Sequence, residues 1–202
     1  SQSSPPIDYI IVVIFKQLEI EIDEFGVIIM EYNCFYQSPV GQLELVSDGQ
    51  YLTQLLFSNQ QQPTERENKA SLPIFKQTRS WLDTYFKEER PQETIPIQPS
   101  GTTFQQYVWE ELNQIEYGKL TTYGDIAQCI AQKMNKDKMS AQAVGGAVGS
   151  NPISIIIPCH RVVGKNGSLT GYGGTLPNKI KLLEIENIDM THLFTPKHTT
   201  KP

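Results

Sequence analysis

The sequence predicts a mixed α/β (α+β) protein with two lobes: a small N-terminal β-sheet lobe with a helix, and a mostly helical C-terminal lobe. Short β-rich runs fill residues 10–57, whereas helical apolar spacing dominates residues 102–186. Prolines at positions 91, 96 and 99 separate the two regions. A length of 202 residues with 39% hydrophobic content is ordinary for globular domains, which excludes a disordered, collagen-like or coiled-coil chain.

Strands are expected first along the chain. Apolar runs divided by charged residues predict short strands at 10–15, 18–22 and 26–30. Residues 35–57 are typical of an antiparallel meander. One of its turns is marked by Pro39 and Gly41, and the Asp48-Gly49 pair is a hairpin signal between alternating strands.

A helix and a linker complete the first half. Residues 58–71 have no periodicity and predict a polar loop. Residues 73–87 predict a helix with Phe75, Trp81, Leu82, Tyr85 and Phe86 on its inner side. The proline-rich stretch 91–101 predicts a linker. The predicted division is an N-terminal extension (1–29), an α/β lobe (30–90), the linker, a helical lobe (102–186) and a C-terminal tail (187–202).

The helical lobe is expected to hold four helices. A first helix ends at Tyr117-Gly118, and a third one, rich in small residues, is stopped by Asn151-Pro152. The expected N-caps of the first three are Thr102 or Thr103, Thr121 or Thr122, and Ser140. Residues 153–157 predict a short buried extended run, and residues 177–186 predict a last amphipathic helix.

Charge and cysteine content limit the function and the compartment. The net charge of −5 argues against a non-specific nucleic-acid coat, but residues 101–186 hold 8 Lys or Arg against 7 Asp or Glu and leave room for a small binding face. The longest apolar run has seven residues, whereas a membrane helix needs about 20. No signal peptide is evident, and three cysteines predict reduced thiols. We therefore expect an intracellular protein, cytoplasmic or nuclear, with no membrane contact.

Two features of the helical lobe point to chemistry. Residues 121–150 have the outline of a helix-turn-helix, which fits DNA binding or plain helix packing. Cys159 lies in Pro-Cys-His-Arg, where the adjacent His160, held by a carboxylate such as Glu186, could activate the thiol. The alternative is that Cys159 is a small buried core residue. A zinc site is disfavoured, because there is no Cys-x-x-Cys and no histidine pair at ligand spacing.

Together these motifs resemble the O6-alkylguanine-DNA alkyltransferases, also called methylated-DNA–protein-cysteine methyltransferases. The resemblance is carried by NPISIIIPCHRVVGKNGSLTGYGG, with TTYGDIA and AQAVGGAVGSNP before it and KLLEIE after it, and more weakly from Met30 onward. It implies a repair protein that flips O6-alkylguanine out of double-stranded DNA and moves the alkyl group to its own cysteine. Each molecule would work once, without a cofactor or metal, and a monomer is the expected state.

The resemblance also implies roles for particular residues. Cys159 would accept the alkyl group, His160 would take the thiol proton through a water, and Glu186 would orient His160. Asn151 would hold the turn between the DNA-binding helix and the active-site segment. The implied substrate contacts are Tyr123, Tyr172, Gly173 and Val162. The implied DNA contacts are Ser140, Ala141, Gln142, Gly145 and Thr122.

Gln142 departs from the family pattern, in which an arginine fills the gap left by the flipped base. Glutamine is shorter and uncharged, so we expect less efficient base extrusion or weaker DNA binding. Three alternatives stay open: an alkyltransferase-like protein that binds alkylated DNA without transfer, a helix-turn-helix module with a buried cysteine, and a Cys-His hydrolase.

The remaining distinctive side chains are expected to have structural or surface roles. Cys129, Trp81 and Trp109 are predicted to lie in the lobe cores, and Arg161 is predicted to tie the active-site turn to its surroundings. Three lysines are candidates for phosphate contacts or simply for a solvated turn: Lys133, Lys136 and Lys138.

Overall fold

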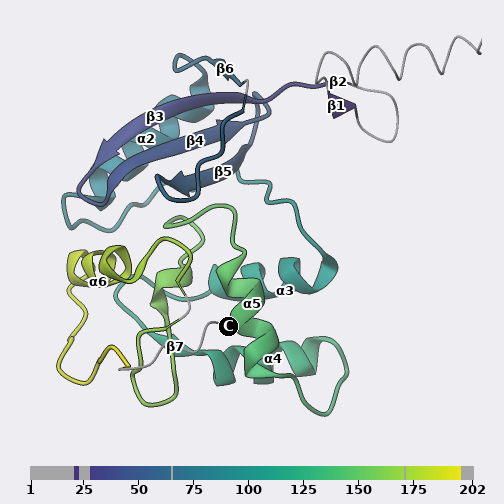
Figure 1. The fold of residues 1–202 in the computed structure, drawn as a ribbon, viewed down its shortest axis with the longest axis vertical. Helices are drawn as coiled ribbons and strands as arrows, with labels where there is room; N and C mark the ends of the chain where they lie inside the picture. The colour runs from purple at the N-terminus through teal and green to yellow at the C-terminus, as the bar shows by residue number, and fades with distance from the viewer. Residues whose placement is uncertain (1–20, 23–27, 65, 171, 197–202) are drawn as a thin grey trace, which may run out of the picture.

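The computed structural model describes residues 21–22, 28–64, 66–170 and 172–196 (Figure 1). The strand predicted at 10–15 lies outside these residues. The described parts of the next two runs form short antiparallel strands, β1 (Glu21–Ile22) and β2 (Ile28–Ile29). The predicted α+β fold class is confirmed, since a strand-rich lobe sits on a lobe made mostly of helices and loops.

A four-stranded sheet with the order β5-β4-β3-β6 forms the N-terminal lobe. Three of its strands pair antiparallel as the meander predicts: β3 (Tyr32–Ser38), β4 (Gly41–Ser47) and β5 (Leu52–Phe57). Both predicted turns are present, with Gly41 at φ 94° and Gly49 at φ 101°, where a side chain would be strained. Asp48 supports the second turn by accepting two backbone N–H groups.

The prediction of an unstructured polar loop over residues 58–71 is wrong in part. Its residues Glu67–Asn68 form strand β6, which pairs parallel with β3. The neighbouring Arg66 guanidinium contacts the carboxylates of Glu31 at 2.8 Å and Glu44 at 3.3 Å, and Glu44 is buried. Ionic contacts of this kind leave no hydrophobic periodicity in the sequence.

Helix α2 (Pro73–Tyr85) lies behind the sheet in Figure 1 and ends two residues earlier than predicted. Its buried side includes Phe75, Leu82 and Tyr85, which belong to one apolar cluster with residues of β4 and β5. Trp81 packs against this cluster but stays half-buried, so it lies at the edge of the core rather than inside it.

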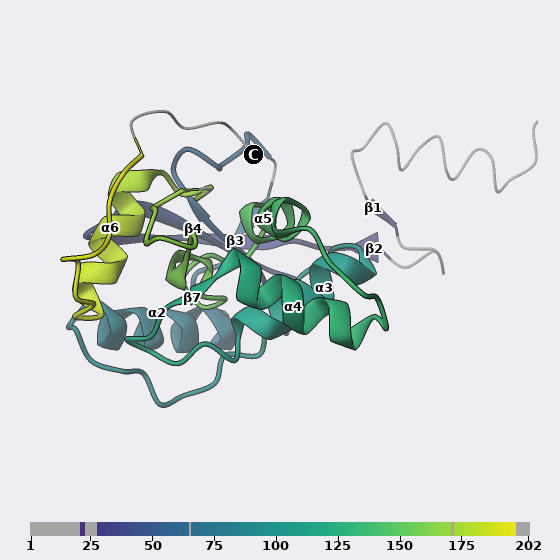
Figure 2. The same cartoon turned by 90° about the horizontal axis from the view of Figure 1, so that it is seen from below.

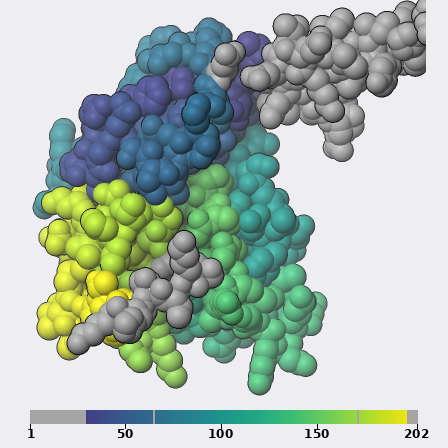
Figure 3. Space-filling view, viewed as in Figure 1, coloured from purple at the N-terminus to yellow at the C-terminus, as the bar shows by residue number. Residues whose placement is uncertain are grey.

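The outer edge of β5 is covered by two later segments of the chain. Leu52 exchanges backbone hydrogen bonds with residues 96–98, and Leu55 does so with residues 152–154, at N···O distances of 2.9–3.1 Å. Residues 96–98 belong to the predicted linker, and residues 152–154 lead into the Cys159 segment. The active-site segment is thereby fastened directly to the sheet, and the two lobes are in close contact (Figure 3).

Four helices build the C-terminal lobe: α3 (Thr103–Leu112), α4 (Tyr123–Lys133), α5 (Ala141–Gly149) and α6 (Leu176–Ile185). The predicted N-caps are confirmed, and they are Thr102, Thr122 and Ser140. Helices α4 and α5 lie side by side, joined by the predicted polar turn (Figure 2). Trp109 is buried, as predicted. None of the helices in the described part of the chain has both the length and the apolar content to cross a membrane.

Two predictions in this lobe are wrong. Helix α3 ends at Leu112 rather than near Gly118, and the residues between them form turns. Residues 153–157 form a buried turn, not an extended run, with Ile155 at φ 71°. A short apolar run shows burial but does not distinguish a strand from a turn.

Part of the predicted C-terminal tail packs onto the body. Phe194 exchanges backbone hydrogen bonds with Gly167 and Leu169, at 3.1 and 2.9 Å. Leu193 packs against the small apolar cluster that contains Leu169 and Leu183. This contact supports the loop of residues 164–174, which carries two of the implied substrate contacts.

Candidate active site

Cys159 begins a short 3-10 turn, η1 (Cys159–Arg161), directly after Pro158. Its side chain is buried, and burial raises the pKa of the thiol. The Asn151 amide, with Nδ2 3.1 Å from Sγ, and the charge of Lys179 act in the opposite direction. Because the pKa is raised on balance, Cys159 rests as a thiol, and a neighbouring group has to remove its proton before it can attack.

Asn151 connects the end of α5 to the Cys159 segment. Its Oδ1 accepts the N–H of Ile153 at 3.0 Å, and its Nδ2 donates to the Ile157 carbonyl at 2.9 Å as well as to the Cys159 sulfur. One buried amide thus closes the turn of residues 152–157 and contacts the thiol.

Glu186, just beyond the end of α6, accepts five hydrogen bonds. Oε1 lies 2.6 Å from His160 Nε2, 2.9 Å from the Tyr85 hydroxyl and 2.9 Å from Arg161 Nη2. Oε2 accepts from Arg161 Nε at 2.8 Å and from the Gly118 N–H at 3.0 Å. Burial alone would raise the pKa of this carboxyl, but the hydrogen bonds from His160 and Arg161, together with the charge of Arg161, outweigh burial and hold its pKa at about 2.

His160 is held as a neutral base. A carboxylate only accepts hydrogen bonds, so Nε2 carries the ring proton toward Glu186 and Nδ1 is left as the acceptor. Nδ1 is buried and has no hydrogen-bond partner within the described part of the chain. Burial lowers the pKa of His160, and the charges of Arg161 and Lys179 lower it further. Glu186 raises this pKa but does not outweigh them. The neutral ring with an accepting Nδ1 is suited to take a proton at neutral pH.

Arg161 holds the active-site turn to its surroundings, as predicted. Its guanidinium holds Glu186 through two nitrogens, and its Nη1 donates to the Ile115 carbonyl at 2.7 Å. The cation compensates the charge of Glu186, so His160 need not be protonated to pair with it.

Two of the implied substrate contacts, Tyr123 and Tyr172, lie near the thiol. Tyr123 begins α4 and donates to the Thr170 carbonyl at 2.9 Å, and Tyr172 is half-buried and packs against the main apolar cluster. Burial and the nearby Cys159 raise the pKa of both phenols. Val162 is buried in β8 (Val162–Val163), which pairs parallel with β7 (Thr121–Thr122).

Gly173 has neighbours from both lobes. Asn59, from the loop after β5, donates to the Gly173 carbonyl at 3.0 Å. A Cβ at position 173 would lie 3.0 Å from Gln60 Nε2 and 3.2 Å from the Gly149 carbonyl, so this position has little room for a side chain.

Sequence reasoning missed two residues of this site, Lys179 and Tyr85. Lys179 is buried and donates to the carbonyls of Val162 at 2.6 Å and Thr170 at 3.1 Å, and burial lowers its pKa to about 8. A signal for it was present, because Lys179 precedes Glu186 by seven residues and so shares its side of the helix. Tyr85 gave no such signal, since it contacts His160 across 75 residues of chain.

The implied DNA contacts lie in α5, at its N-cap and at the N-cap of α4. Ser140, Ala141 and Gln142 are exposed at the start of α5, and Thr122 caps α4. Gly145 lies over the Tyr123 ring, where a Cβ would be 3.8 Å from Cδ1. Gly145 of α5 thus contacts the Tyr123 ring, which in turn lies near Cys159.

A shallow hollow of about 450 Å³ adjoins this surface, between α4, the following turn and Ala141. Lys136 and Lys138 line it and are exposed. Lys133 instead contacts Glu111, with Nζ 3.0 Å from the carboxylate. Of the three lysine candidates for phosphate contacts, Lys136 and Lys138 are therefore the better placed.

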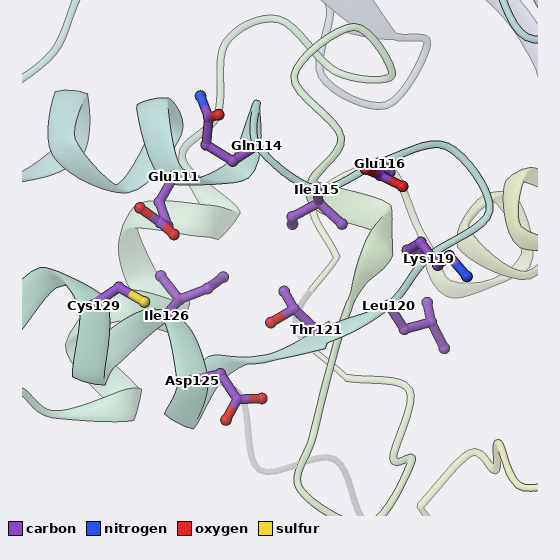
Figure 4. Close-up of a pocket in the computed structure, with 10 residues that line it drawn as sticks. All are labelled: Glu111, Gln114, Ile115, Glu116, Lys119, Leu120, Thr121, Asp125, Ile126 and Cys129. Atoms are coloured by element: carbon purple, nitrogen blue, oxygen red, sulfur yellow. The ribbon is translucent and has the colours of Figure 1, made fainter.

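A second hollow, of about 380 Å³, lies between α3 and the start of α4 (Figure 4), and Cys159 is not among the residues that line it. Its lining includes Glu111, Glu116 and Asp125, so its charge does not suit a phosphate backbone. Cys129 lies at its edge and is half-buried, so the prediction of a core position is wrong. Burial and the neighbouring Glu111 raise the pKa of the Cys129 thiol.

Fold and site define an α+β protein in which a buried cysteine with a histidine base lies beneath a surface helix pair. Residues 32–99 match the family profile described as 6-O-methylguanine DNA methyltransferase, ribonuclease-like domain, and residues 103–188 match its DNA binding domain. The chain is 46% identical over 174 residues to the methylated-DNA–protein-cysteine methyltransferase of Haemophilus influenzae, covering 85% of this chain and 93% of the relative. It is 42% identical over 154 residues to that of Mycobacterium leprae, covering 74% and 88%.

Solved structures agree with these relatives. The Mycobacterium tuberculosis protein OGT in complex with DNA has a TM-score of 0.68 and 40% identity, covering 77% of this chain and 92% of that one. The Mycobacterium tuberculosis O6-methylguanine methyltransferase has the same TM-score and 38% identity, covering 78% and 93%. The chain belongs to the methylated-DNA–protein-cysteine methyltransferase family.

Proposed function

We propose that this protein repairs O6-alkylguanine in double-stranded DNA by transferring the alkyl group to Cys159. The observation that carries the proposal is a buried thiol whose sulfur Asn151 contacts, followed directly in the chain by a buried histidine whose ring Glu186 holds. The thioether formed is stable, so each molecule acts once. The transfer needs no cofactor or metal, and the protein acts as a monomer.

The proposed transfer is an in-line displacement. His160 takes the thiol proton at Nδ1 through a water, and the thiolate attacks the alkyl carbon. The sulfur–carbon bond forms as the bond from carbon to O6 breaks, and the electron pair goes to the guanine, which then takes up a proton. Tyr123, Tyr172, the Gly173 N–H and Val162 surround the flipped base, and the hydrogen-bond donors among them stabilise the charge as it develops near O6.

The helical lobe, residues 102–186, is proposed to bind the DNA. Ser140, Ala141, Gln142 and Gly145 of α5 and Thr122 at the start of α4 contact the duplex, and helix N-terminal amides meet phosphates. The damaged guanine is flipped out of the helix toward Cys159, which costs less for a damaged base than for an intact pair. The lobe at 30–90 supports this one across the linker at 91–101.

Intact-mass measurement and peptide mapping test the proposal. After incubation with a duplex containing one O6-methylguanine, we expect one added methyl group per protein, on the peptide that holds Cys159. The peptides with Cys34 and Cys129 stay unmodified and serve as internal controls, and Cys159→Ala takes up no methyl group.

Other outcomes would each contradict the transfer. Tight binding of the modified duplex without a mass change would make the protein an alkyltransferase-like sensor. Binding that does not distinguish modified from unmodified DNA, with no mass change, would indicate a plain helix-turn-helix module. Repeated turnover without a permanent mark on the protein would indicate a hydrolase.

A further inference from the structure

Tyr85 brings a hydroxyl of the N-terminal lobe into the site of the C-terminal lobe. It is the last residue of α2, and its side chain is completely buried. The hydroxyl donates to Glu186 Oε1 at 2.9 Å, and its oxygen lies 3.3 Å from His160 Nε2. Trp81 stacks on the Tyr85 ring, with centroids 5.4 Å apart and an interplanar angle of 8°, and Tyr117 packs edge-on. The ring is therefore fixed, and the hydroxyl has a defined direction.

We infer that Tyr85 is a positioning residue, which sets how strongly Glu186 holds His160 during alkyl transfer. This inference rests on the proposed function. The oxygen that faces His160 is the one that Tyr85 and Arg161 also contact. Each donor takes up part of the negative charge of Oε1, so a proton on His160 is less strongly stabilised. The imidazole stays neutral, and Nδ1 stays free to accept the thiol proton.

The charges around His160 define what the hydroxyl can change. The titratable and charged groups that face it are Lys179 from α6, Glu186 just beyond the end of α6, Arg161 and Cys159 from η1, and Tyr85 from α2. Arg161 already balances the charge of Glu186. An uncharged hydroxyl reduces the negative charge that Oε1 presents to His160 without adding a second cation next to the imidazole. It also fixes the carboxylate in place. Loss of the hydroxyl should then raise the pKa of His160.

Tyr85→Phe tests this inference because it keeps the packed ring and removes the hydroxyl. Tyr36→Phe is a matched control: its hydroxyl also donates to a carboxylate, Asp83 at 2.7 Å, and Asp83 is on the same helix as Tyr85. Single-turnover methyl transfer is measured from about pH 5 to pH 9. For Tyr85→Phe we expect the acidic limb of the rate profile to move to higher pH by about half a unit, with a rate about threefold lower at the acidic end. Tyr36→Phe keeps the wild-type profile.

A second variant should act in the opposite direction. Site-specific 3-fluorotyrosine at position 85 is a stronger donor than tyrosine and should move the acidic limb down. Nitrogen NMR of His160 gives its pKa directly in each protein. An unchanged His160 pKa and an unchanged limb in both Tyr85 variants would overturn the inference. A uniform loss of rate at every pH, in proportion to lost thermal stability, would also overturn it, because only packing would then be involved.

The two proposals can fail separately. If the wild-type protein puts no methyl group on Cys159, the proposed function fails, and the NMR titration still decides whether Tyr85 controls the pKa of His160. If the wild type transfers methyl and Tyr85→Phe has the wild-type pH profile, the positioning role of Tyr85 alone is wrong.

Discussion

At the scale of single residues, the three cysteines differ in their neighbours rather than in the direction of their pKa shift. Burial raises the pKa of Cys34, Cys129 and Cys159 alike. Cys34 lies beside Arg79 in the sheet lobe, and Cys129 lies beside Glu111 at a surface hollow. Cys159 is followed directly by His160, whose pKa is lowered by burial and whose ring is held by Glu186. Selective alkylation therefore depends on where a proton acceptor is held, not on an acidic resting thiol.

Glu186 should make the stability of the fold depend on pH. Its pKa of about 2 in the folded protein lies below its ordinary 4.5, so the unfolded chain binds the proton more readily. The stabilising contribution is present above pH 4.5 and is lost as the pH falls toward 2. The free energy of unfolding should drop by about 2 kcal/mol between pH 5 and pH 3 from this group alone. Urea unfolding of the wild type and of Glu186→Gln at both pH values measures the difference. Equal pH slopes in the two proteins would contradict the assignment.

The central residues of the site could be predicted from the sequence, whereas contacts between the two lobes could not. Cys159 and His160 are adjacent, and the motif resemblance added Glu186 and Asn151. Tyr85 was predicted as an inward residue of its helix, but no local pattern shows that its hydroxyl reaches the other lobe. Contacts between distant parts of the chain depend on how the lobes dock, and a single sequence does not record this.

At the scale of elements, the helix starts could be predicted because caps are local. Thr102 and Thr122 each form a capping box with the residue three positions on, and Ser140 accepts from the N–H of Ala143. The turn at 153–157 could not be predicted, since its shape depends on Asn151 and on hydrogen bonds to β5. Helix starts were therefore predictable from neighbouring residues, whereas the conformation of the active-site segment was not.

Helix α5 carries the prediction for Gln142. This side chain is exposed in the first turn, so an arginine fits there without repacking. Gln142→Arg should raise the rate of repair of O6-methylguanine in duplex DNA, because arginine adds length and a cation at the position proposed to contact the DNA. Single-turnover kinetics measure the change. Gln92→Arg is a control with the same change in net charge at an exposed site in the linker. No increase for Gln142→Arg, or an equal increase for the control, would refute the specific role.

At the scale of the whole molecule, the lobes share one apolar core. The main cluster joins Leu43 and Phe75 of the N-terminal lobe with Val108, Ile130 and Ile153 of the C-terminal lobe. Hydrogen bonds at β5 and the contacts of Tyr85 and Asn59 add to this interface. The N-terminal lobe thus contributes packing and hydrogen bonds that support the site.

A shared core predicts a single unfolding transition. Trp81 reports on the N-terminal lobe and Trp109 on the C-terminal lobe. In Trp81→Phe and Trp109→Phe, the fluorescence of the remaining tryptophan should change at the same urea concentration as the far-ultraviolet circular dichroism of that variant. Separate midpoints for fluorescence and dichroism in either variant would show that the lobes unfold independently.

The covered edge of β5 also bears on how this protein behaves when it is stressed. The strand reads LTQLLF, an apolar segment without charge, glycine or proline. Segments of this kind form intermolecular strands once their edge is open. The chain that leads to Cys159 supplies half of the cover, so separation of residues 152–154 from β5 would free backbone groups that another molecule can pair with. The hydrogen bonds that fasten the Cys159 segment to the sheet therefore also protect the protein from aggregation.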